Sequence, residues 1–333
     1  FTELVWADEF DGTGSPDPTK WHHQTQLPNG VSWYNGEAQH YTNRLDNSYL
    51  EDGFLHIVAK KETFTDQGQT KAYTSARLNS KFAFTYGRVE ARAKLPFGAG
   101  TWPAIWTLGQ NINEPGGYWT PQFGTVNWPA CGEIDIMEHW GYNQNYIQSA
   151  LHTPSSFGNT SNLGGVLAND VSNVFHIYAL EWGPEKMEFS IDGSVYYTYA
   201  PNPRDASTWP FDANQYLLLN VAMAGAIDPT FTESEMVIDY IRVYQEAETS
   251  IADEQLSGVR VFPNPVTTHL NIEFEEQLRD AQVSVYSPVG QLVHTQAATG
   301  SVLALDWASY PDGIYLVVVK AERGQRSFKV LKR

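Results

Sequence analysis

Residues 131–141 read CGEIDIMEHWG, and this stretch decides how the chain is expected to fold. Glu133 and Asp135 alternate with Ile134 and Ile136, which is the pattern of a β-strand with one polar and one buried face. Similar alternation recurs through the first 245 residues, bounded by Gly, Pro, Asn or Asp, in FLHIVA (54–59), RVEARAKL (88–95), FHIYALEW (175–182) and VIDYIRVY (237–244). Many short strands with turn residues between them predict an all-β sandwich or closed sheet.

Length and composition bound the possibilities further. The chain has 333 residues, of which 42% are apolar and 18% charged, so it can bury the cores of about two domains. A single cysteine, Cys131, excludes an internal disulfide. No apolar run approaches about 18 residues, so we expect no membrane span. A net charge of −17 argues against nucleic acid as a partner, because binding phosphates requires clustered Lys and Arg.

Composition changes at residues 246–257 (EAETSIADEQLS), which hold four acids, no base and no aromatic residue. We interpret this stretch as an acidic linker. Residues 1–245 carry ten of the 11 tryptophans, whereas residues 258–333 contain only Trp307. The smaller region repeats short alternating segments, which predicts a small Ig-like β-sandwich of about seven strands.

The position of Glu138 requires an irregularity in the strand at 131–141. Glu138 lies five residues after Glu133, so a regular strand would bury it with the isoleucines, and an unpaired buried carboxylate is very costly. One extra residue at Met137, a β-bulge, would return Glu138 to the face of Glu133 and Asp135. We therefore predict three carboxyl groups on one face.

Three carboxyl groups on one face repel one another, so their pKa values are expected to differ. One can stay ionised while another holds a proton near neutral pH. Hydrolysis of a glycosidic bond uses such a pair, with one carboxylate as nucleophile or base and one carboxylic acid as proton donor. Taken alone, the motif is also compatible with an acidic strand facing water or with a set of calcium ligands. The residues around it are needed to distinguish these alternatives from a catalytic site.

Residues 100–109 (GTWPAIWTLG) and 128–138 (WPACGEIDIME) resemble glycoside hydrolase family 16, in particular its laminarinase (endo-β-1,3-glucanase) branch. Further ordered matches are WADEF (6–10), WYNGEAQ (33–39), YTSAR (73–77), YGRVE (86–90), HT (152–153) and IDYIRVY (238–244). The resemblance implies a β-jelly-roll sandwich with a substrate cleft across its concave face. It also implies a retaining double displacement in which Glu133 is the nucleophile, Glu138 is the acid and base, and Asp135 tunes Glu133.

The resemblance also assigns residues to sugar binding. Glucose rings have an apolar face that stacks on tryptophan and a polar rim that binds side-chain donors and acceptors. The residues implied are Asn35, Glu37 and Arg77 on the glycone side, Trp102, Trp106 and Trp128 in the cleft, and His152 near the cleaved bond. Trp128 has core packing as its alternative, and His152 taken alone is more typical of a packed or surface histidine.

Members of the family often carry a structural calcium on the convex face. The matching positions are Glu9, the backbone carbonyl of Gly53, and Asp239. Two carboxylates and a carbonyl suit a hard cation that prefers oxygen ligands. The alternative is that Glu9 and Asp239 bond to backbone or to arginine. No organic cofactor is expected.

The C-terminal region has a resemblance of its own. VRVFPNPV (259–266), VYSPVGQL (285–292), PDGIYL (311–316) and the basic end KVLKR (329–333) are similar to the C-terminal sorting domain of the type IX secretion system. This implies the type IX machinery as a partner, export through the periplasm, and release or attachment at the cell surface. The alternative is a generic Ig-like or fibronectin-like spacer.

Together these patterns predict a secreted, monomeric, retaining endo-β-1,3-glucanase that hydrolyses laminarin-type β-glucans. The alternatives are a hydrolase of mixed-linkage β-glucan or another neutral β-polysaccharide, a non-catalytic β-glucan-binding protein, and a surface adhesin. The loop after Met223 is shorter than in typical laminarinases, which leaves chain-length and linkage preference open. Residues 111–127, rich in Gly, Pro and aromatic residues, are expected to wall part of the cleft.

Overall fold

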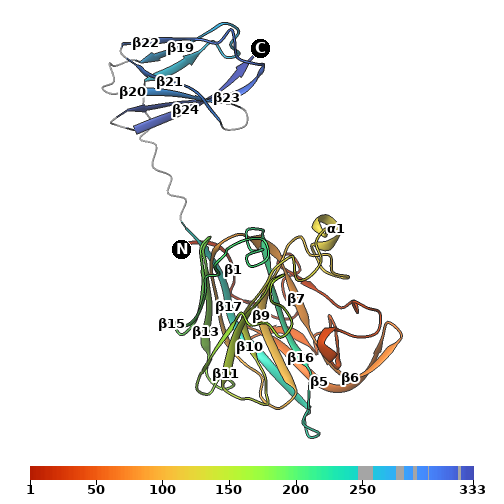
Figure 1. The fold of residues 1–333 in the computed structure, drawn as a ribbon. Coiled ribbons are helices and arrows are strands. Elements are labelled where there is room, and N and C mark those ends of the chain that lie inside the picture. Colours follow the sequence, from red (N-terminus) through yellow and green to blue (C-terminus); the bar gives the residue numbers. More distant parts are fainter. Residues whose placement is uncertain (247–257, 275–280, 288–290, 299, 322–323) are drawn as a thin grey trace. The chain divides into compact units, whose positions relative to one another are not determined.

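The computed structural model describes residues 1–246, 258–274, 281–287, 291–298, 300–321 and 324–333. The chain forms two compact units, Phe1–Glu246 and Ala247–Arg333 (Figure 1). The predicted linker at 246–257 lies, apart from its first residue, outside the described residues. No helix among the described residues combines the length and the apolar character needed to cross a membrane.

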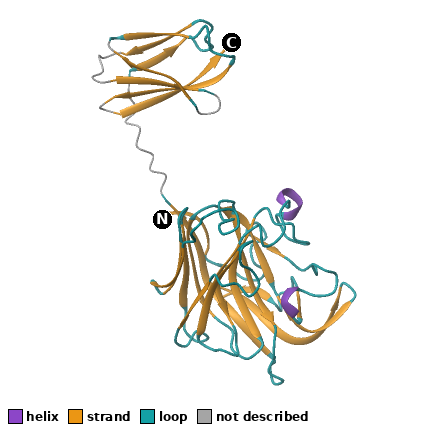
Figure 2. Cartoon of the chain, in the orientation of Figure 1, coloured by secondary structure: helices purple, strands orange, loops and turns teal. Residues whose placement is uncertain are grey.

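The larger unit consists mostly of strands (Figure 2). They form two β-sheets packed around a main hydrophobic core. The ten-stranded sheet has the order β15 (Ser194–Tyr199), β14 (Met187–Ile191), β13 (His176–Trp182), β8 (Gly87–Lys94), β17 (Glu233–Gln245), β5 (Phe54–Asp66), β6 (Gln69–Ser75) and β3 (Gln39–Tyr41). Two further strands pair with members of this sheet, β1 (Glu3–Asp8) with β17 and β4 (Ser48–Glu51) with β5.

The second sheet of this unit will be called the cleft sheet. Its order is β12 (Leu163–Leu167), β11 (Tyr146–His152), β10 (Glu133–His139), β9 (Thr101–Gly109), β16 (Gln215–Met223), β7 (Arg77–Phe84) and β2 (Trp21–His23). The helices of the unit are short, a 3₁₀ turn η1 (Tyr34–Gly36) and α1 (Thr120–Phe123). The all-β jelly-roll prediction is confirmed.

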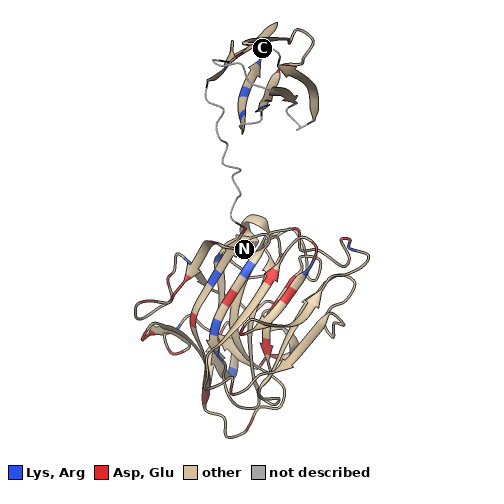
Figure 3. Cartoon of the chain, turned by 90° about the vertical axis from the view of Figure 1, so that its left-hand side faces the viewer, with Lys and Arg blue, Asp and Glu red and all other residues tan. Residues whose placement is uncertain are grey.

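Alternation along strand β8 shows why the ten-stranded sheet forms. Val89, Ala91 and Ala93 are buried, while Arg88 and Arg92 lie on the other face and are partly exposed. On that outer face charges of both signs are interleaved (Figure 3), and Arg88 pairs with Glu181 of β13. The strand thus contributes apolar groups to the core and charged groups to solvent.

Two Asp-Gly pairs form turns that connect antiparallel neighbours in the ten-stranded sheet. Asp52 and Gly53 have φ values of 53° and 81° between β4 and β5, and Asp192 and Gly193 have 50° and 79° between β14 and β15. Positive φ at both central positions defines the type I′ turn, whose twist matches that of the flanking strands. Glycine tolerates this conformation without steric cost.

Residues 111–127, named here the wall segment, cover part of the cleft sheet. Ile112 packs with Tyr216 and Leu218 of β16 in a small separate cluster. Leu217 and Leu219 of the same strand belong to the main core, so Tyr216 and Leu218 lie on the opposite face of the sheet. The wall segment therefore sits on the face of the sheet that carries the cleft.

The smaller unit is also a β-sandwich in its described residues. One sheet has the order β18 (Val259–Phe262), β19 (His269–Phe274) and β22 (Val302–Asp306). The other has the order β21 (Leu292–Ala298), β20 (Ala281–Tyr286), β23 (Gly313–Ala321) and β24 (Gly324–Lys332). Trp307 is fully buried in the core they share, so this tryptophan offers no surface for a sugar ring.

Candidate active site

Strand β10 carries the predicted bulge. Against β9, Asp135 pairs with Trp106 but Met137 already pairs with Ile105, so one extra residue is accommodated between them. Against β11, the register shifts between Asp135 and Glu138. Met137 is fully buried in the core, and Glu138 faces the cleft with Asp135. The predicted bulge is confirmed and involves Ile136 and Met137, and its effect is to present three carboxyl groups to one cavity.

A cleft of about 1090 Å³ runs across this sheet. The predicted catalytic and sugar-binding residues all line it, namely Asn35, Glu37, Arg77, Trp102, Trp106, Trp128, Glu133, Asp135, Glu138 and His152. Lining residues that the sequence analysis missed include Tyr34, Glu114, Tyr142, Tyr146, Gln148 and Asn220. Asn220 could have been found, since it is the one polar residue within the apolar run LLLNVAM of β16.

Glu138 is a buried carboxyl group with a well-placed indole donor. It is 8% exposed, and the Trp102 indole N–H donates to its Oε1 at 3.0 Å. Burial, followed by the charge of Asp135, raises the pKa of Glu138 to about 8. A carboxyl group that keeps its proton at neutral pH is suited to act as a general acid.

Glu133 and Asp135 form a tightly coupled pair. Burial and the neighbouring Asp135 raise the pKa of Glu133, while His152 and the indole N–H of Trp128 oppose the rise. That indole donates to Glu133 Oε2 at 2.9 Å. Burial raises the pKa of Asp135 as well. Because donors favour the ionised form at Glu133, we assign the shared proton to Asp135 and the negative charge to Glu133.

His152 is oriented by the backbone of the following loop. The Gly158 N–H donates to His152 Nδ1 at 3.0 Å, so this nitrogen accepts and the proton of the neutral ring is assigned to Nε2. Nε2 lies 3.3 Å from Asp135 Oδ2 and 3.6 Å from Glu133 Oε1. The three side chains place potential ligand atoms within 4.8 Å of one another, but an Nε2 that carries a proton has no lone pair for a metal. The arrangement favours proton sharing over metal binding.

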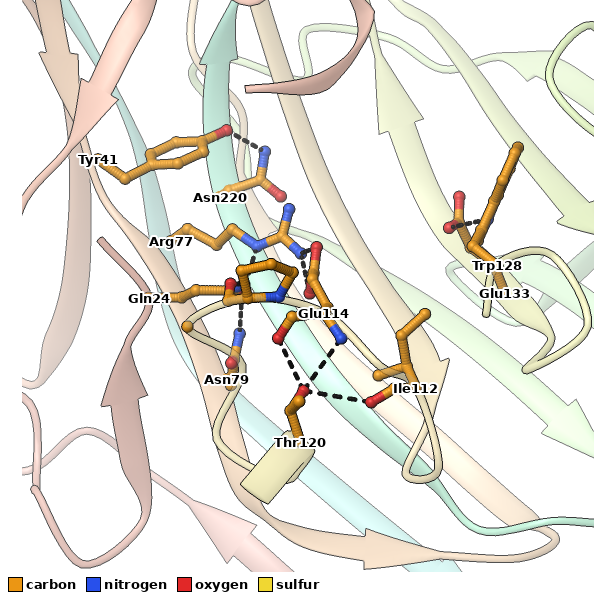
Figure 4. Close-up of polar contacts among 12 residues, drawn as sticks. Gln24, Tyr41, Arg77, Asn79, Ile112, Glu114, Thr120, Trp128, Glu133 and Asn220 are labelled. Atoms are coloured by element: carbon orange, nitrogen blue, oxygen red, sulfur yellow. Dashed lines mark hydrogen bonds and ion pairs between the residues drawn. The ribbon is translucent and has the colours of Figure 1, made fainter. Parts of the chain in front are cut away.

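Arg77 of β7 lines the cleft and is itself buried. It is 3% exposed, and its Nη2 donates to both carboxylate oxygens of Glu114 at 2.9 and 3.1 Å (Figure 4). Its Nε donates to Gln24 at 2.9 Å, and its guanidinium lies 5.2 Å from the ring centre of Trp33 and 4.8 Å from that of Trp106. Arg77 therefore connects Glu114 of the wall segment to the ring of Trp106. Direct binding of sugar by Arg77 stays a prediction.

A second set of hydrogen bonds holds the other edge of Trp106. Its indole N–H donates to Asn220 Oδ1 at 2.7 Å, and the Asn220 amide donates to the Tyr41 hydroxyl oxygen at 3.1 Å. Tyr41 in turn donates to Glu37 Oε2 at 2.9 Å. This buried chain fixes the plane of the Trp106 ring, which is the property that a stacking platform for sugars needs.

The predicted calcium ligands belong to the ten-stranded sheet and its turns: Asp239 lies in β17, Gly53 in the turn between β4 and β5, and Glu9 directly after β1. The Glu9 carboxylate accepts two hydrogen bonds from Arg242, each of 2.8 Å, and these hold the pKa of Glu9 below its usual range. Asp239 is paired with Arg92. Binding of calcium with the Gly53 carbonyl would require both guanidinium groups to release their carboxylates, and the calcium site stays a prediction.

Calcium is expected to raise the melting temperature by several degrees relative to EDTA if Glu9, Gly53 and Asp239 bind it. An ion that binds only the folded state at 100 times its Kd stabilises that state by about 2.7 kcal/mol. Differential scanning calorimetry measures this directly, and Asp239→Asn should remove the difference. Equal melting temperatures with calcium and with EDTA would show that Glu9 and Asp239 do not bind calcium and serve only as partners of Arg242 and Arg92.

Replacing Glu138 by glutamine is expected to stabilise the protein at pH 8 while leaving stability at pH 4 almost unchanged. A folded-state pKa raised from 4.5 to about 8 means that the folded state binds more protons than the unfolded state between these values. Stability therefore falls as pH rises through this window, by on the order of 3 kcal/mol near pH 8. Urea denaturation at both pH values checks the prediction, with Glu185→Gln as the surface control. Equal stability of variant and wild type at pH 8 would contradict it.

Comparisons with known proteins were made for both units. Residues 35–242 match the family model described as glycosyl hydrolases family 16, and residues 260–333 match that of the secretion system C-terminal sorting domain. The Beta-glucanase of Rhodothermus marinus is 40% identical over 263 residues, which cover 74% of this chain and 86% of that protein. Glucan endo-1,3-beta-glucosidase A1 of Niallia circulans is 34% identical, with 73% of this chain and 38% of that protein covered.

Solved structures include a close structural relative. A LamA variant from Zobellia galactanivorans, in complex with laminaritriose and laminaritetraose, is 47% identical with a TM-score of 0.69. The match covers 74% of this chain and 100% of that one. The share of this chain that is matched is about the length of the larger unit, Phe1–Glu246.

Proposed function

The chain belongs to glycosyl hydrolases family 16, and on this premise we propose that it is a retaining endo-β-1,3-glucanase that hydrolyses laminarin-type polysaccharides. The observation that carries the proposal is the bulged strand β10, which presents Glu133, Asp135 and Glu138 to a single cleft. Loss of one of these acids would have favoured a glucan-binding protein without activity. All three are present; Asp135 and Glu138 are buried and Glu133 is partly buried, and such burial raises carboxyl pKa values toward neutral pH.

The reaction follows from the two ionisation states. Glu133 reacts in its ionised form, which Trp128 and His152 favour, and attacks the anomeric carbon, while the proton of Glu138 passes to the oxygen of the leaving sugar. The resulting glycosyl ester on Glu133 is opened by water, whose proton returns to Glu138. Two displacements at one carbon restore its configuration. Asp135 keeps its proton close to Glu133 and thereby limits the repulsion between the acids.

The charge of the cleft favours a neutral polysaccharide. Among the described residues that line it, Arg77 is the only Lys or Arg, and it is buried against Glu114. The carboxyl groups of Glu37, Glu133, Asp135 and Glu138 also face this cavity. A sulfated or uronic-acid polymer would meet these acids without a free cation to bind it. Neutral β-1,3-glucan fits this cleft. Mixed-linkage β-glucan is the second candidate, because it is also uncharged and the charges of the cleft do not distinguish the two polymers.

The C-terminal unit carries the export signal of the protein. Its match to a secretion system C-terminal sorting domain marks the chain for export, to the cell surface or the medium. A polysaccharide too large to enter a cell requires its hydrolase outside, so the location agrees with the proposed substrate.

A reducing-sugar assay with purified full-length protein tests the proposed substrate. We expect the highest kcat/KM on laminarin, lower activity on lichenan, and none above background on agarose or carrageenan. Oligosaccharide products of several lengths early in the reaction would support endo action. Activity confined to agarose or carrageenan, or absent on every β-glucan, would contradict the proposal.

A further inference from the structure

Each of the two catalytic glutamates accepts a hydrogen bond from a different tryptophan. Trp102 on β9 donates its indole N–H to Glu138 Oε1 at 3.0 Å, and Trp128, ahead of β10, donates to Glu133 Oε2 at 2.9 Å. Both rings had been predicted to bind sugar through their faces. Their N–H edges are instead directed at the groups that carry out the reaction.

An indole N–H is an uncharged group that can donate a hydrogen bond but cannot accept one. It can therefore only lower the pKa of a carboxyl group that it contacts. It favours the ionised form, because that form accepts the hydrogen bond more strongly. At Glu138 it also selects an oxygen. With Oε1 accepting from Trp102, the transferable proton belongs on Oε2, where it can reach the substrate.

Other groups around the two carboxyls come from β10 and β11. Asp135 acts on both glutamates and raises their pKa, and His152 opposes it at both. Gln148 of β11 is a further donor toward Glu138. Asp135 therefore raises the pKa of both glutamates, and His152 lowers the pKa of both. Neither residue can change the pKa of one glutamate without changing that of the other. Each indole contacts only one glutamate.

We propose that Trp102 and Trp128 are positioning residues, each of which sets the ionisation and orientation of one catalytic glutamate through its indole N–H. This inference rests on the proposed function, since it assigns the two carboxyl groups their roles in hydrolysis. It extends that function by naming, for each catalytic glutamate, the residue that tunes its proton affinity and orients its carboxyl group separately from the other.

Trp106 supplies a matched control on the same strand as Trp102. It lines the same cleft, but its indole N–H donates to the amide oxygen of Asn220 and not to a carboxyl group. Phenylalanine at any of the three positions keeps an aromatic face and removes the N–H. Only the variants at 102 and 128 should then alter proton binding by the catalytic acids.

The test is the pH dependence of kcat/KM on laminarin for wild type, Trp128→Phe, Trp102→Phe and Trp106→Phe. Trp128→Phe should move the acidic limb, which reports Glu133, upward by about half a pH unit, because this tryptophan is 41% exposed and its contact is partly screened. Trp102→Phe should move the basic limb, which reports Glu138, upward by about one pH unit. Trp106→Phe should raise KM and leave both limbs in place.

Unmoved limbs in Trp102→Phe and Trp128→Phe, or an equal shift in Trp106→Phe, would overturn the inference. A wild type inactive on every glucan would instead contradict the proposed function. In that case titration of ¹³C-labelled glutamate carboxyl resonances, assigned with Glu133→Gln and Glu138→Gln, decides the inference without turnover. A raised titration midpoint for the glutamate facing each removed indole supports it, and unchanged midpoints overturn it.

Discussion

Replacing Glu133 with alanine is expected to lower kcat on laminarin by roughly ten-thousand-fold or more. The variant has no group that can form the glycosyl ester, while Glu138 and the cleft remain. Substrate binding should persist, so KM is expected to change far less than kcat. Steady-state kinetics with a reducing-sugar assay measure both.

Two controls accompany this variant. Its melting temperature should equal or exceed that of wild type, because burial and the neighbouring Asp135 raise the pKa of Glu133 and so make its ionised form unfavourable in the folded state. Azide should restore part of the activity by attacking the anomeric carbon in the space left by the side chain, with an α-linked glycosyl azide as product. Activity within ten-fold of wild type, without added nucleophile, would show that another residue is the nucleophile.

Removing the carboxylate of Glu114 is expected to cause the largest loss of stability. Glu114→Ala leaves Arg77, which is 3% exposed, as an unpaired charge in the interior. Breaking a buried ion pair in this way costs about 3–5 kcal/mol, which corresponds to a melting temperature lower by roughly 10 °C for a unit of this size. KM should rise as well, because Arg77 supports Trp106.

A double variant separates charge from packing. Arg77→Met combined with Glu114→Leu removes both charges and keeps side-chain volume, so it should recover most of the lost stability. It should not recover KM, since methionine cannot hold the Trp106 ring as a guanidinium does. A melting temperature of Glu114→Ala within 2 °C of wild type would show that this pair does not connect the wall segment to the sheet.

The strands and the bulge could be predicted because they follow from neighbours in sequence. Glu133 and Asp135 alternate with isoleucines, and the cost of burying Glu138 alone required the extra residue at Met137. Glu114 carries no comparable local signal. It acts only through Arg77, 37 residues earlier, and nothing in the spacing of the chain specifies that the wall segment folds over β7.

The aromatic residues show a second limit. The family resemblance implied that Trp102, Trp106 and Trp128 lie in a sugar-binding cleft, and all three do line the cleft. Sequence periodicity gives the face of a strand on which a side chain lies. It does not give the rotamer, and the rotamer determines whether the face or the N–H edge of an indole meets a neighbour.

The measurement that tests the account most directly is proton NMR of the reducing end released in the first minutes of laminarin hydrolysis. Attack by Glu133 followed by water, with Glu138 donating and then accepting the proton, predicts that the β-anomer appears first. The α-anomer should then grow only at the rate of mutarotation. Initial release of the α-anomer would mean a single displacement by water, and the roles assigned to the acids of strand β10 would be wrong.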